Sequence, residues 1–289
     1  MSTHLGLIGG SGLYGLALED ATWREVDTPW GPPSDAILTG TLDGVPVSFL
    51  PRHGRGHVHA PGEIPARANV AALKALGVTD ALSISAVGSF REGMAPGHVV
   101  VVDQAVDRTV GRPSSFFGTG LVAHVSLADP TCARLSAHVA DAAEAAGSAV
   151  HRGGTYLCME GPQFSSRVES RLWRGLGCDV IGMTMMPEAR LMREAEICYA
   201  VAATVTDYDS WHEGEAVDVS AVMAVLAANV AAGRDIAAGL PARLEGGHPC
   251  PCGCDRALDH AVMTAPERRD PALAERLRAV AGRVLRETP

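Results

Sequence analysis

The sequence predicts an α/β protein, with a β-sheet that carries helices on its faces. Two observations support this. Short β-branched runs alternate with longer Ala-rich segments of helical period, and several of the apolar runs end in glycine-rich or polar loops. With 289 residues, of which 47% are apolar and 20% charged, the chain can bury a large core. This composition excludes a disordered, collagen-like or small disulfide-rich protein, and it fits one large α/β domain or two smaller ones.

The first half of the expected sheet is marked by turn signals. Residues 4–10 form a buried strand that ends in glycine, and residues 36–41 and 45–50 form a hairpin. The hairpin is predicted by Asp43-Gly44, because this pair favours the primed turns of two-residue hairpin loops. A helix over residues 64–76 ends before Gly77, a typical helix stop. Strands follow at 81–86 and 99–103.

The second half alternates in the same way. Asp129-Pro130 signals the start of a helix over residues 131–146, and Gly177 closes a helix over residues 165–176. The uninterrupted apolar run 197–206 predicts a central strand that is buried on both faces. The other expected strands are 156–159 and 180–181, and the other expected helices are 188–196, 217–238 and 268–286.

Charge and apolar length limit the possible partners. There are 24 Lys and Arg against 33 Asp and Glu, a net charge of −9, which disfavours nucleic acid and anionic membranes as partners. A local basic pocket for a small anion remains compatible with this total. The apolar stretch 219–233 includes Ser220 and Asn229 and is shorter than the roughly 20 residues of a spanning helix. The N-terminus lacks the basic region of a signal peptide, so we expect a cytoplasmic protein.

The composition changes once, at LEGGHPCPCGCD (residues 244–255). We therefore expect a main domain over 1–243, a Cys-rich loop over 244–263, and a C-terminal helix within 264–289 that packs on the same domain. Four cysteines in apolar settings are expected to be reduced core thiols: Cys132, Cys158, Cys178 and Cys198.

Three interpretations are open for Cys250, Cys252 and Cys254: a disulfide, a metal-binding knuckle with His248 or His260, or a plain loop. Ligands two residues apart are awkward for a closed tetrahedral zinc site, and the cytoplasm disfavours a disulfide. Reduced thiols without a metal are therefore the favoured interpretation.

The glycine loop after the first strand matches GxGxxG at Gly10, Gly12 and Gly15. A dinucleotide site would also need a helix and then a second strand that ends in an acid about 20 residues on. The segment that follows, with Trp23 and a run of prolines at 29–33, suits neither element. The other interpretations are a structural turn and, favoured here, an anion site built from backbone N–H groups and the Ser11 hydroxyl.

A basic loop, PRHGRGHVH (residues 51–59), follows the hairpin. Arginine offers a planar fork to an oxyanion, so this loop predicts phosphate capture, with a solvated surface loop as the alternative. Metal binding by its histidines is disfavoured, because no helix or acidic partner would hold them. The small residues 83–89 form either a tight turn or a second place where backbone N–H groups approach an anion.

Three later loops also carry candidates. Ser165 or Ser166 could cap the helix after Phe164, and Phe164 could stack on a flat ligand. The Met-rich loop 182–188 forms either core or pocket wall. Asp207 and Asp209 follow the buried strand at i and i+2, so both side chains can point to one side. Burial and mutual repulsion would raise a pKa there, which suits a proton donor or an acceptor for base N–H groups; the alternative is a capped turn.

Read in order, the segments resemble the methylthioadenosine phosphorylase branch of the trimeric purine nucleoside phosphorylase family, from residue 5 to about 238. The segments that carry the resemblance are GLIGGSG, DTPWGPPSD, PRHGRGH, SAVGS, DQAVDRT, EGPQFSSR, GMTMMPE and TDYDSW. The resemblance implies a central mixed sheet with a small barrel-like portion, flanked by helices. It also implies a homotrimer with active sites at the subunit borders, and phosphorolysis of 5′-methylthioadenosine to adenine and 5-methylthioribose 1-phosphate. Inorganic phosphate is the co-substrate, and no cofactor or metal is expected.

The resemblance also implies roles for individual residues. Phosphate would meet Ser11, Arg52, His53, Ser85, Ala86 and Thr184. The nucleoside would meet Phe164, Met183, Asp207 and Asp209, an apolar 5′ pocket of Val219, Val222 and Met223, and His124 from the neighbouring subunit. Ser165 and Gly182 bear on specificity, and Gly182 departs from the Asn that is common in adenine-type members.

Chemistry agrees with these roles. Cleavage of the N-glycosidic bond leaves negative charge on the purine, which a protonated Asp207 would neutralise as general acid. Asp209 could accept from the exocyclic amine and so favour adenine. Asp rather than Asn at position 207 also favours adenine, since the resemblance puts Asn there in 6-oxopurine enzymes.

Several alternatives stay open. They are other nucleosides (5′-deoxyadenosine or 5′-haloadenosine, methylthioinosine, inosine), an NAD-dependent oxidoreductase that uses GxGxxG, and a non-catalytic nucleoside-binding module. The module would not need an anion site, so the presence of Arg52, His53 and Thr184 counts against it.

Overall fold

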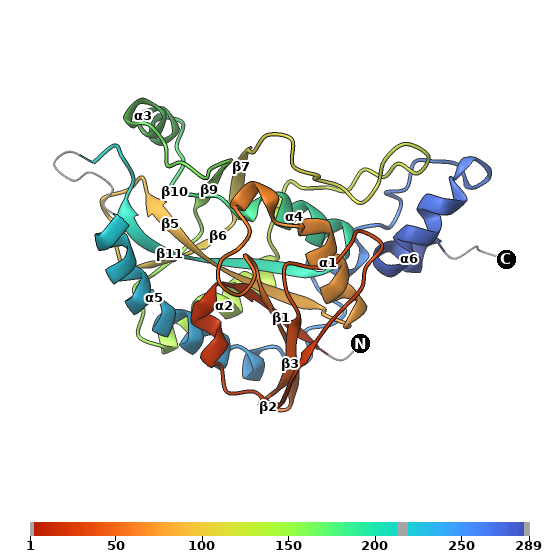
Figure 1. The fold of residues 1–289 in the computed structure, drawn as a ribbon, viewed down its shortest axis with the longest axis horizontal. Helices are drawn as coiled ribbons and strands as arrows, with labels where there is room; N and C mark the ends of the chain where they lie inside the picture. The colour runs from red at the N-terminus through yellow and green to blue at the C-terminus, as the bar shows by residue number, and fades with distance from the viewer. Residues whose placement is uncertain (1–2, 213–218, 286–289) are drawn as a thin grey trace.

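An eleven-stranded mixed sheet forms the centre of the computed structural model, which describes residues 3–212 and 219–285 (Figure 1). The strands are β1 (Leu5–Gly9), β2 (Glu19–Arg24), β3 (Ile37–Leu42), β4 (Val45–Pro51), β5 (Asp80–Ser89), β6 (Val99–Val102), β7 (Gln104–Arg108), β8 (Val150–Arg152), β9 (Thr155–Met159), β10 (Val180–Gly182) and β11 (Cys198–Tyr208). The helices are α1 (Ala66–Ala75), α2 (Ala133–Ala145), α3 (Arg167–Gly175), α4 (Met185–Glu194), α5 (Val219–Gly239) and α6 (Pro271–Leu285).

The sheet branches at its longest neighbours, β5 and β11. One arm runs β2-β3-β4-β1-β5, and β11 lies parallel to β5 on the other side. Beyond the end of β1, the last residues of β5 pair with antiparallel β10, which leads to β9 and β7. β11 also pairs with β6, and only Asp103 separates β6 from β7. The ring β5-β11-β6/β7-β9-β10 is therefore nearly closed, which confirms the expected mixed sheet with a barrel-like portion.

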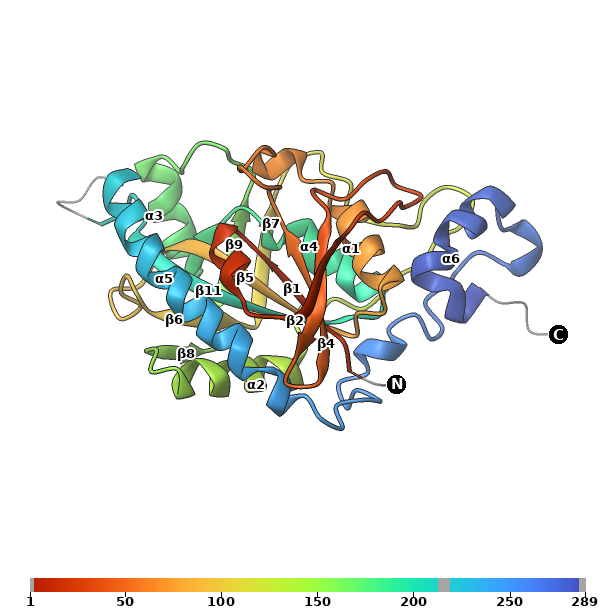
Figure 2. The same ribbon diagram turned by 60° about the horizontal axis from the view of Figure 1, so that its bottom comes forward.

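Helices cover both faces of this sheet, α1 and α4 on one and α2 and α5 on the other (Figures 1 and 2). Alternate residues of β11 supply the two cores because side chains of a strand alternate between faces. Tyr199, Val201 and Ala203 pack towards α1 and α4, whereas Cys198, Ala200 and Ala202 pack towards α2 and α5. The prediction that 197–206 is a strand buried on both faces is confirmed.

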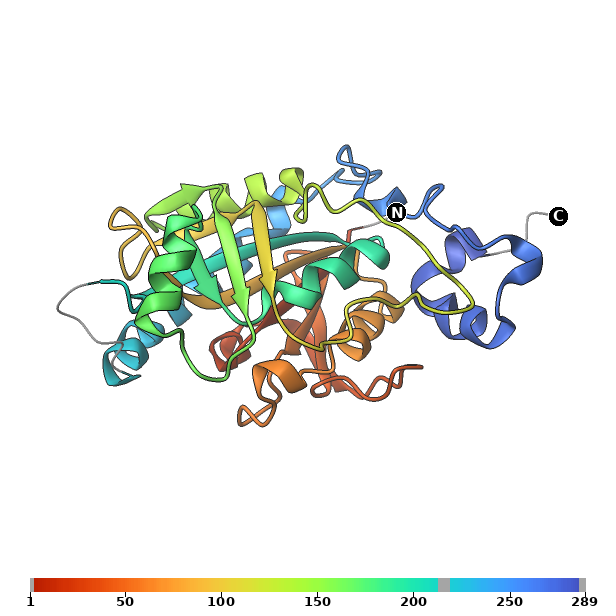
Figure 3. The same cartoon turned by 90° about the horizontal axis from the view of Figure 1, so that it is seen from above.

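The C-terminal segment packs along the body at the end opposite α3 (Figure 3). Leu277, Val280 and Ala281 of α6 are buried in the same apolar cluster as Val70 and Leu73 of α1. Between α5 and α6 the chain forms three short 3₁₀ turns: η3 (Pro241–Arg243), η4 (Cys254–Arg256) and η5 (Pro266–Arg268). None of the helices in the described ranges combines the length and apolarity that crossing a bilayer requires.

Within the described residues all expected helices and strands occur, with ends shifted by a few residues, but β2, β7 and β8 were not expected. Residues 217, 218 and 286 of the expected helices lie outside the described ranges. β2 is an exposed, polar edge strand without alternating apolar residues, so the expectation that the segment after the glycine loop forms no strand was wrong. β2 pairs antiparallel with β3, and a 3₁₀ turn, η1 (Ser11–Gly15), replaces the helix of a dinucleotide fold. The GxGxxG match therefore does not belong to a Rossmann unit.

The hairpin turn between β3 and β4 is confirmed in detail. Asp43 and Gly44 have φ of 50° and 76°, both in the left-handed region that a type I′ turn requires. This turn carries the chain from β3 into β4, which ends at Pro51, directly before Arg52.

Candidate active site

A cavity of about 390 Å³ lies between the ends of β5, β10 and β11, the glycine loop and α5. Its place agrees with the expectation that ligands bind beyond the carboxyl ends of strands in an open α/β sheet. Ten of the residues predicted for the site line it: Arg52, His53, Ser85, Ala86, Phe164, Gly182, Met183, Thr184, Asp207 and Asp209.

The other residues predicted for the site do not line this cavity, or their side chains lie outside the described part of the structure. Ser165 is buried behind Asp209, and its hydroxyl donates to Asp209 Oδ2 at 2.6 Å. His124 and Met223 are exposed and do not line the cavity of their own chain. The side chains of Ser11, Val219 and Val222 lie outside the described residues, although Gly10 and Gly12, on either side of Ser11, line the cavity.

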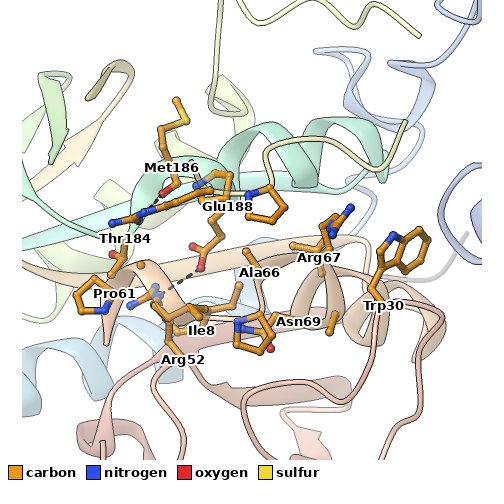
Figure 4. A pocket seen from close by; sticks show the side chains of 18 residues that line it. Ile8, Trp30, Arg52, Pro61, Ala66, Arg67, Asn69, Thr184, Met186 and Glu188 are labelled. Carbon is orange, nitrogen blue, oxygen red and sulfur yellow. Dashed lines mark hydrogen bonds and ion pairs between the residues drawn. The ribbon is translucent and has the colours of Figure 1, made fainter. Parts of the chain in front are cut away.

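Arg52 lies directly after β4 and is 3% exposed. Its Nε atom donates to Glu188 Oε2 at 3.1 Å, as the dashed line in Figure 4 shows. Nη1 donates to the Ile84 carbonyl at 3.0 Å, and Nη2 donates to Ser83 Oγ at 2.5 Å and to the Ile8 carbonyl at 3.4 Å. Four of its five N–H groups are therefore bound by protein, which fixes the guanidinium and leaves one Nη1 hydrogen for a ligand.

His53 is held as a neutral imidazole beside Arg52. Its Nδ1 lies 2.9 Å from the His59 carbonyl oxygen, which can only accept, so Nδ1 carries the hydrogen. Burial lowers the pKa of His53 to about 4, with the charge of Arg52 acting in the same direction. The ring stacks on His57, with centroids 4.2 Å apart. In this tautomer Nε2 is a hydrogen-bond acceptor.

Hydroxyl groups gather next to this basic pair. Ser85 Oγ lies 3.1 Å from both Thr184 Oγ1 and the Tyr156 hydroxyl. Burial raises the pKa of Tyr156 to about 12, so this phenol stays protonated. A Cβ atom on Gly182 would lie 1.9 Å from the Tyr156 oxygen. The Tyr156 hydroxyl therefore occupies the space that a side chain at position 182 would need.

The two acids lie side by side at the other end of the cavity. A β-bulge between Val205 and Asp207 shifts the pairing of β11 with β5, which sets Asp207 opposite Gly88. A Cβ on Gly88 would lie 3.3 Å from both Asp207 Oδ2 and Asp209 Cβ, so β5 approaches the two acids closely at this glycine. Burial raises the pKa of Asp207, and the charge of Asp209 raises it further, against a hydrogen bond from Thr206.

Arg112 positions two of the active-site loops, although no pattern in the sequence indicated this. Its Nη1 atom donates to the carbonyls of Met183 (2.8 Å) and Met186 (2.9 Å), and Nη2 donates to the carbonyl of Glu160 at 2.6 Å. Its Nε donates to the Glu160 carboxylate at 3.0 Å. The Glu160 loop is close to Met183, since a Cβ on Gly161, whose φ is 69°, would lie 2.4 Å from the Met183 sulfur.

Sequence reasoning missed other residues of the site. Glu188 and Tyr156 act through partners distant in sequence, and only Glu188, a charged residue inside an otherwise apolar Met-rich loop, gave a local signal. Asn229 and Leu226 line the cavity from α5, where they look like ordinary helix residues. His57 also lines it, and it belongs to the basic loop that the sequence did single out.

Residues 4–239 match the profile of the phosphorylase superfamily, and with the cavity described this decides the family. The chain belongs to the phosphorylase superfamily. It is 65% identical to an S-methyl-5′-thioadenosine phosphorylase of Cereibacter sphaeroides, over 99% of this chain and 100% of the relative. A relative of the same name from Bradyrhizobium diazoefficiens is 55% identical over 98% of each chain.

Solved structures agree with this family. A methylthioadenosine phosphorylase from an Antarctic soil metagenomic library superposes with a TM-score of 0.91 and 42% identity, over 96% of this chain and 99% of that chain. A methylthioadenosine phosphorylase from Schistosoma mansoni in complex with adenine gives a TM-score of 0.79 and 36% identity, over 83% and 91%. This chain is therefore a phosphorylase-family enzyme with the nucleoside phosphorylase fold. The oxidoreductase and non-catalytic alternatives do not hold.

Proposed function

We propose that this enzyme cleaves S-methyl-5′-thioadenosine with inorganic phosphate, giving adenine and 5-methylthioribose 1-phosphate. The observation that carries the proposal is one cavity with two unlike ends. Arg52, His53 and Ser85 gather at one end, and the paired acids Asp207 and Asp209 lie at the other. Ser85 and Gly88 are three residues apart on β5, about 10 Å at the usual rise of a strand, which leaves room for a ribose between them.

The basic end suits a phosphate dianion. The remaining Nη1 hydrogen of Arg52 and the hydroxyls of Ser85 and Thr184 can donate to phosphate oxygens. His53 Nε2, as an acceptor, would take the hydrogen of a protonated phosphate oxygen. Phosphate held below the ribose would stabilise the positive charge that develops on the sugar and would then attack its anomeric carbon. No organic cofactor or metal enters this reaction.

The acidic end suits a leaving adenine. Thr206 Oγ1 lies 3.1 Å from the Val87 carbonyl and 2.6 Å from Asp207 Oδ1, and the hydroxyl has only one hydrogen. Thr206 donates to Asp207 when the carboxylate is ionised. When Asp207 is protonated, it can instead donate to Thr206 while Thr206 donates to the Val87 carbonyl, which satisfies both contacts. A raised pKa and this hydrogen-bond chain both favour Asp207 as the general acid that protonates the purine.

Asp209 and the names of the relatives support adenine as the base. Ser165 donates to one oxygen of Asp209, which fixes the carboxylate and leaves acceptor capacity for an exocyclic amine. A buried acceptor of this kind discriminates strongly against a base that lacks the donor. The Schistosoma mansoni structures include an adenine complex and a methylthioadenosine complex of a mutant, which is the same base and substrate.

We also propose a cytoplasmic homotrimer with shared sites. Support comes from His124, which is exposed and stands outside the cavity of its own chain, as a residue that serves the neighbouring subunit's site would. Val219 and Val222 would complete the apolar 5′ pocket together with Met223. His124→Ala should then raise KM for the 5′-methylthio substrate, and a wild-type KM would remove His124 from the site.

The first experiment is adenine release from S-methyl-5′-thioadenosine with and without phosphate, beside 5′-deoxyadenosine, methylthioinosine and inosine. We expect phosphate-dependent release and the highest kcat/KM for the methylthio substrate. Release without phosphate would mean a hydrolase. A preference for the inosine substrates would refute the role of the acid pair in choosing the base.

Asp207→Asn tests the mechanism in the same assay. Loss of a general acid should lower kcat by about 10²–10⁴-fold and relatively favour 6-oxopurines. Asp103→Asn is the control, because Asp103 lies outside the cavity. An unchanged rate and base preference in Asp207→Asn would contradict the assignment.

A further inference from the structure

Four cysteines from three distant parts of the chain meet in one buried cluster. Cys132 precedes α2, Cys198 begins β11, and Cys250 and Cys254 belong to the Cys-rich segment. Their sulfur atoms all lie within 4.8 Å of one another, and all four residues are buried. Cys132 and Cys198 are buried free thiols, as the sequence predicted. What the sequence did not show is that tertiary packing brings both against Cys250 and Cys254.

The geometry points to a structural Zn²⁺ site with these four cysteines as ligands. Zinc binds thiolates at about 2.3 Å in a tetrahedron, which places sulfurs about 3.8 Å apart. The sulfurs of Cys132 and Cys250 are 3.7 Å apart. A closed four-sulfur set is the ligand field of a structural zinc site, and soft thiolates select zinc over hard cations.

The sequence argument against zinc does not apply to this set. It assumed adjacent ligands in Cys-x-Cys, but Cys252 is exposed and is not a member of the cluster. Cys250 and Cys254 are separated by three residues, and Gly253, with φ of 70°, turns the chain between them. Asp255 accepts the N–H of Cys250 at 2.8 Å, so the turn is held in this shape.

The surroundings supply positive charge for a site that would carry two net negative charges. Arg193 Nη1 donates to the Cys254 sulfur at 3.5 Å. Arg134, whose side chain is 10% exposed, lies beside Cys198 and Cys250. Among residues 3–212 and 219–285, its buried Nε and Nη1 atoms find no hydrogen-bond partner, as expected if they face thiolate sulfurs. Such contacts around the ligands are typical of metal sites.

His248 is not one of the four cysteine ligands, but it lies next to them, since His248, Asp80 and Cys198 have their ligand atoms within 4.8 Å of one another. Its Nε2 lies 2.6 Å from Asp80 Oδ2, and Asp80 also pairs with Arg134. None of these residues, and none of the four cysteines, lines the cavity of the proposed reaction. The zinc would therefore be structural, and its presence is independent of the substrate.

A zinc ion here would connect the C-terminal segment, through Cys250 and Cys254, to α2 and β11 of the main domain, through Cys132 and Cys198. In Figures 2 and 3 the blue chain that follows α5 passes beside the yellow-green α2. Farther along the tail, the Ala261 carbonyl accepts the N–H of His124 at 2.9 Å, and the Met263 N–H donates to the Val122 carbonyl at 2.8 Å. Zinc binding releases the four thiol protons to solvent, and its free energy adds to the stability of the packed C-terminal segment.

The test is the metal content of the full chain, expressed with added zinc and purified with a thiol-free reductant and without chelator. We expect one zinc per chain, four sulfur neighbours at about 2.3 Å by X-ray absorption, and zinc release on titration with a mercurial. Cys254→Ser should lose most of its zinc and become more sensitive to proteolysis between residues 240 and 264. Cys252→Ser, in the same loop, is the matched control and should keep its zinc.

Several outcomes would overturn the proposal. They are a chain that stays metal-free after zinc is added under reducing conditions, a mass lower by two hydrogens for each disulfide, and nitrogen in place of sulfur neighbours. Equal zinc content in Cys254→Ser and wild type would place the metal elsewhere. If Cys254→Ser does not fold, the stoichiometry and absorption spectrum of the wild type still decide the question.

Discussion

Glu188 is the buried acid that neutralises Arg52, so Glu188→Gln tests whether the charge of Arg52 serves the phosphate. Glu188 Oε2 accepts from Arg52 Nε at 3.1 Å, and Oε1 accepts from the Tyr199 hydroxyl at 2.7 Å. Glutamine keeps this geometry, with its oxygen towards Arg52 and its NH₂ group donating to the Tyr199 oxygen. The substitution removes the negative charge and also the acceptor of the Tyr199 hydroxyl hydrogen, which must turn to another group.

The size of the effect follows from the distance. Two charges about 4 Å apart interact by about 4 kcal/mol at an effective dielectric constant of 20. Removing one partner of a buried pair typically costs about 3–5 kcal/mol, because the other charge is left uncompensated. We therefore expect the free energy of unfolding of Glu188→Gln to fall by about 3–5 kcal/mol in phosphate-free buffer.

Phosphate should return part of this stability. A bound dianion beside Arg52 supplies the charge that Glu188 no longer provides, so phosphate should bind more tightly to the variant. At a phosphate concentration of about 100 Kd, binding alone adds about 2.7 kcal/mol, and a lower Kd adds more. Urea unfolding at a series of phosphate concentrations measures this linkage.

The control is Glu194→Gln, on the same helix. Glu194 is buried but binds Ser115 and the N–H of Phe116 rather than Arg52. This variant should lose stability without any change in phosphate linkage. If phosphate shifts the unfolding midpoint of Glu188→Gln no more than that of Glu194→Gln, Arg52 does not hold the phosphate.

Three further predictions concern the rest of the site. Gly182→Ala should lower the free energy of unfolding by about 1–3 kcal/mol, because the methyl group is overpacked against Tyr156. In a double-mutant cycle measured by denaturation, Gly182→Ala with Tyr156→Leu should cost less stability than the sum of the two single changes. Strictly additive costs would contradict the contact. Arg112→Met should lower kcat/KM by roughly tenfold or more, because the loops of Glu160 and Met183 lose their shared hydrogen bonds and small displacements of substrate-positioning groups slow catalysis. Wild-type kinetics in a folded variant would count against a positioning role. Asp209→Asn removes a charge that raises the pKa of Asp207, so the alkaline limb of kcat, where the acid loses its proton, should move to lower pH; a limb that stays in place would exclude this coupling.

Local signals in the sequence predicted most of the fold. The apolar run 197–206, the Asp43-Gly44 turn and the helix stops at Gly77 and Gly177 each depend on neighbouring residues, and each marked its element correctly. β2, β7 and β8 were missed because they are short and carry polar or exposed residues without clear alternation. Sheet pairing, not their own residues, makes them strands.

Some residues of the candidate site could be predicted from the sequence, and others could not. Arg52 and His53 directly follow β4, Asp207 is the last residue but one of β11, and Asp209 directly follows it. Their positions along the chain therefore already placed them at the ends of strands, and they line one cavity. Gly182 could be noticed as a departure, but the Tyr156 hydroxyl that fills the space beside it comes from β9 and is 26 residues away. No local pattern reports such a contact.

The sequence by itself determined the α/β architecture, the family and the residue types at the ends of the strands. Those properties are encoded in periodicity and in short ordered motifs. The tertiary structure alone decided that Glu188 neutralises Arg52, that Arg112 joins two loops, and that Cys132 and Cys198 meet Cys250 and Cys254. These contacts join residues far apart in the chain, and folding brings them together only because the core packs in one arrangement.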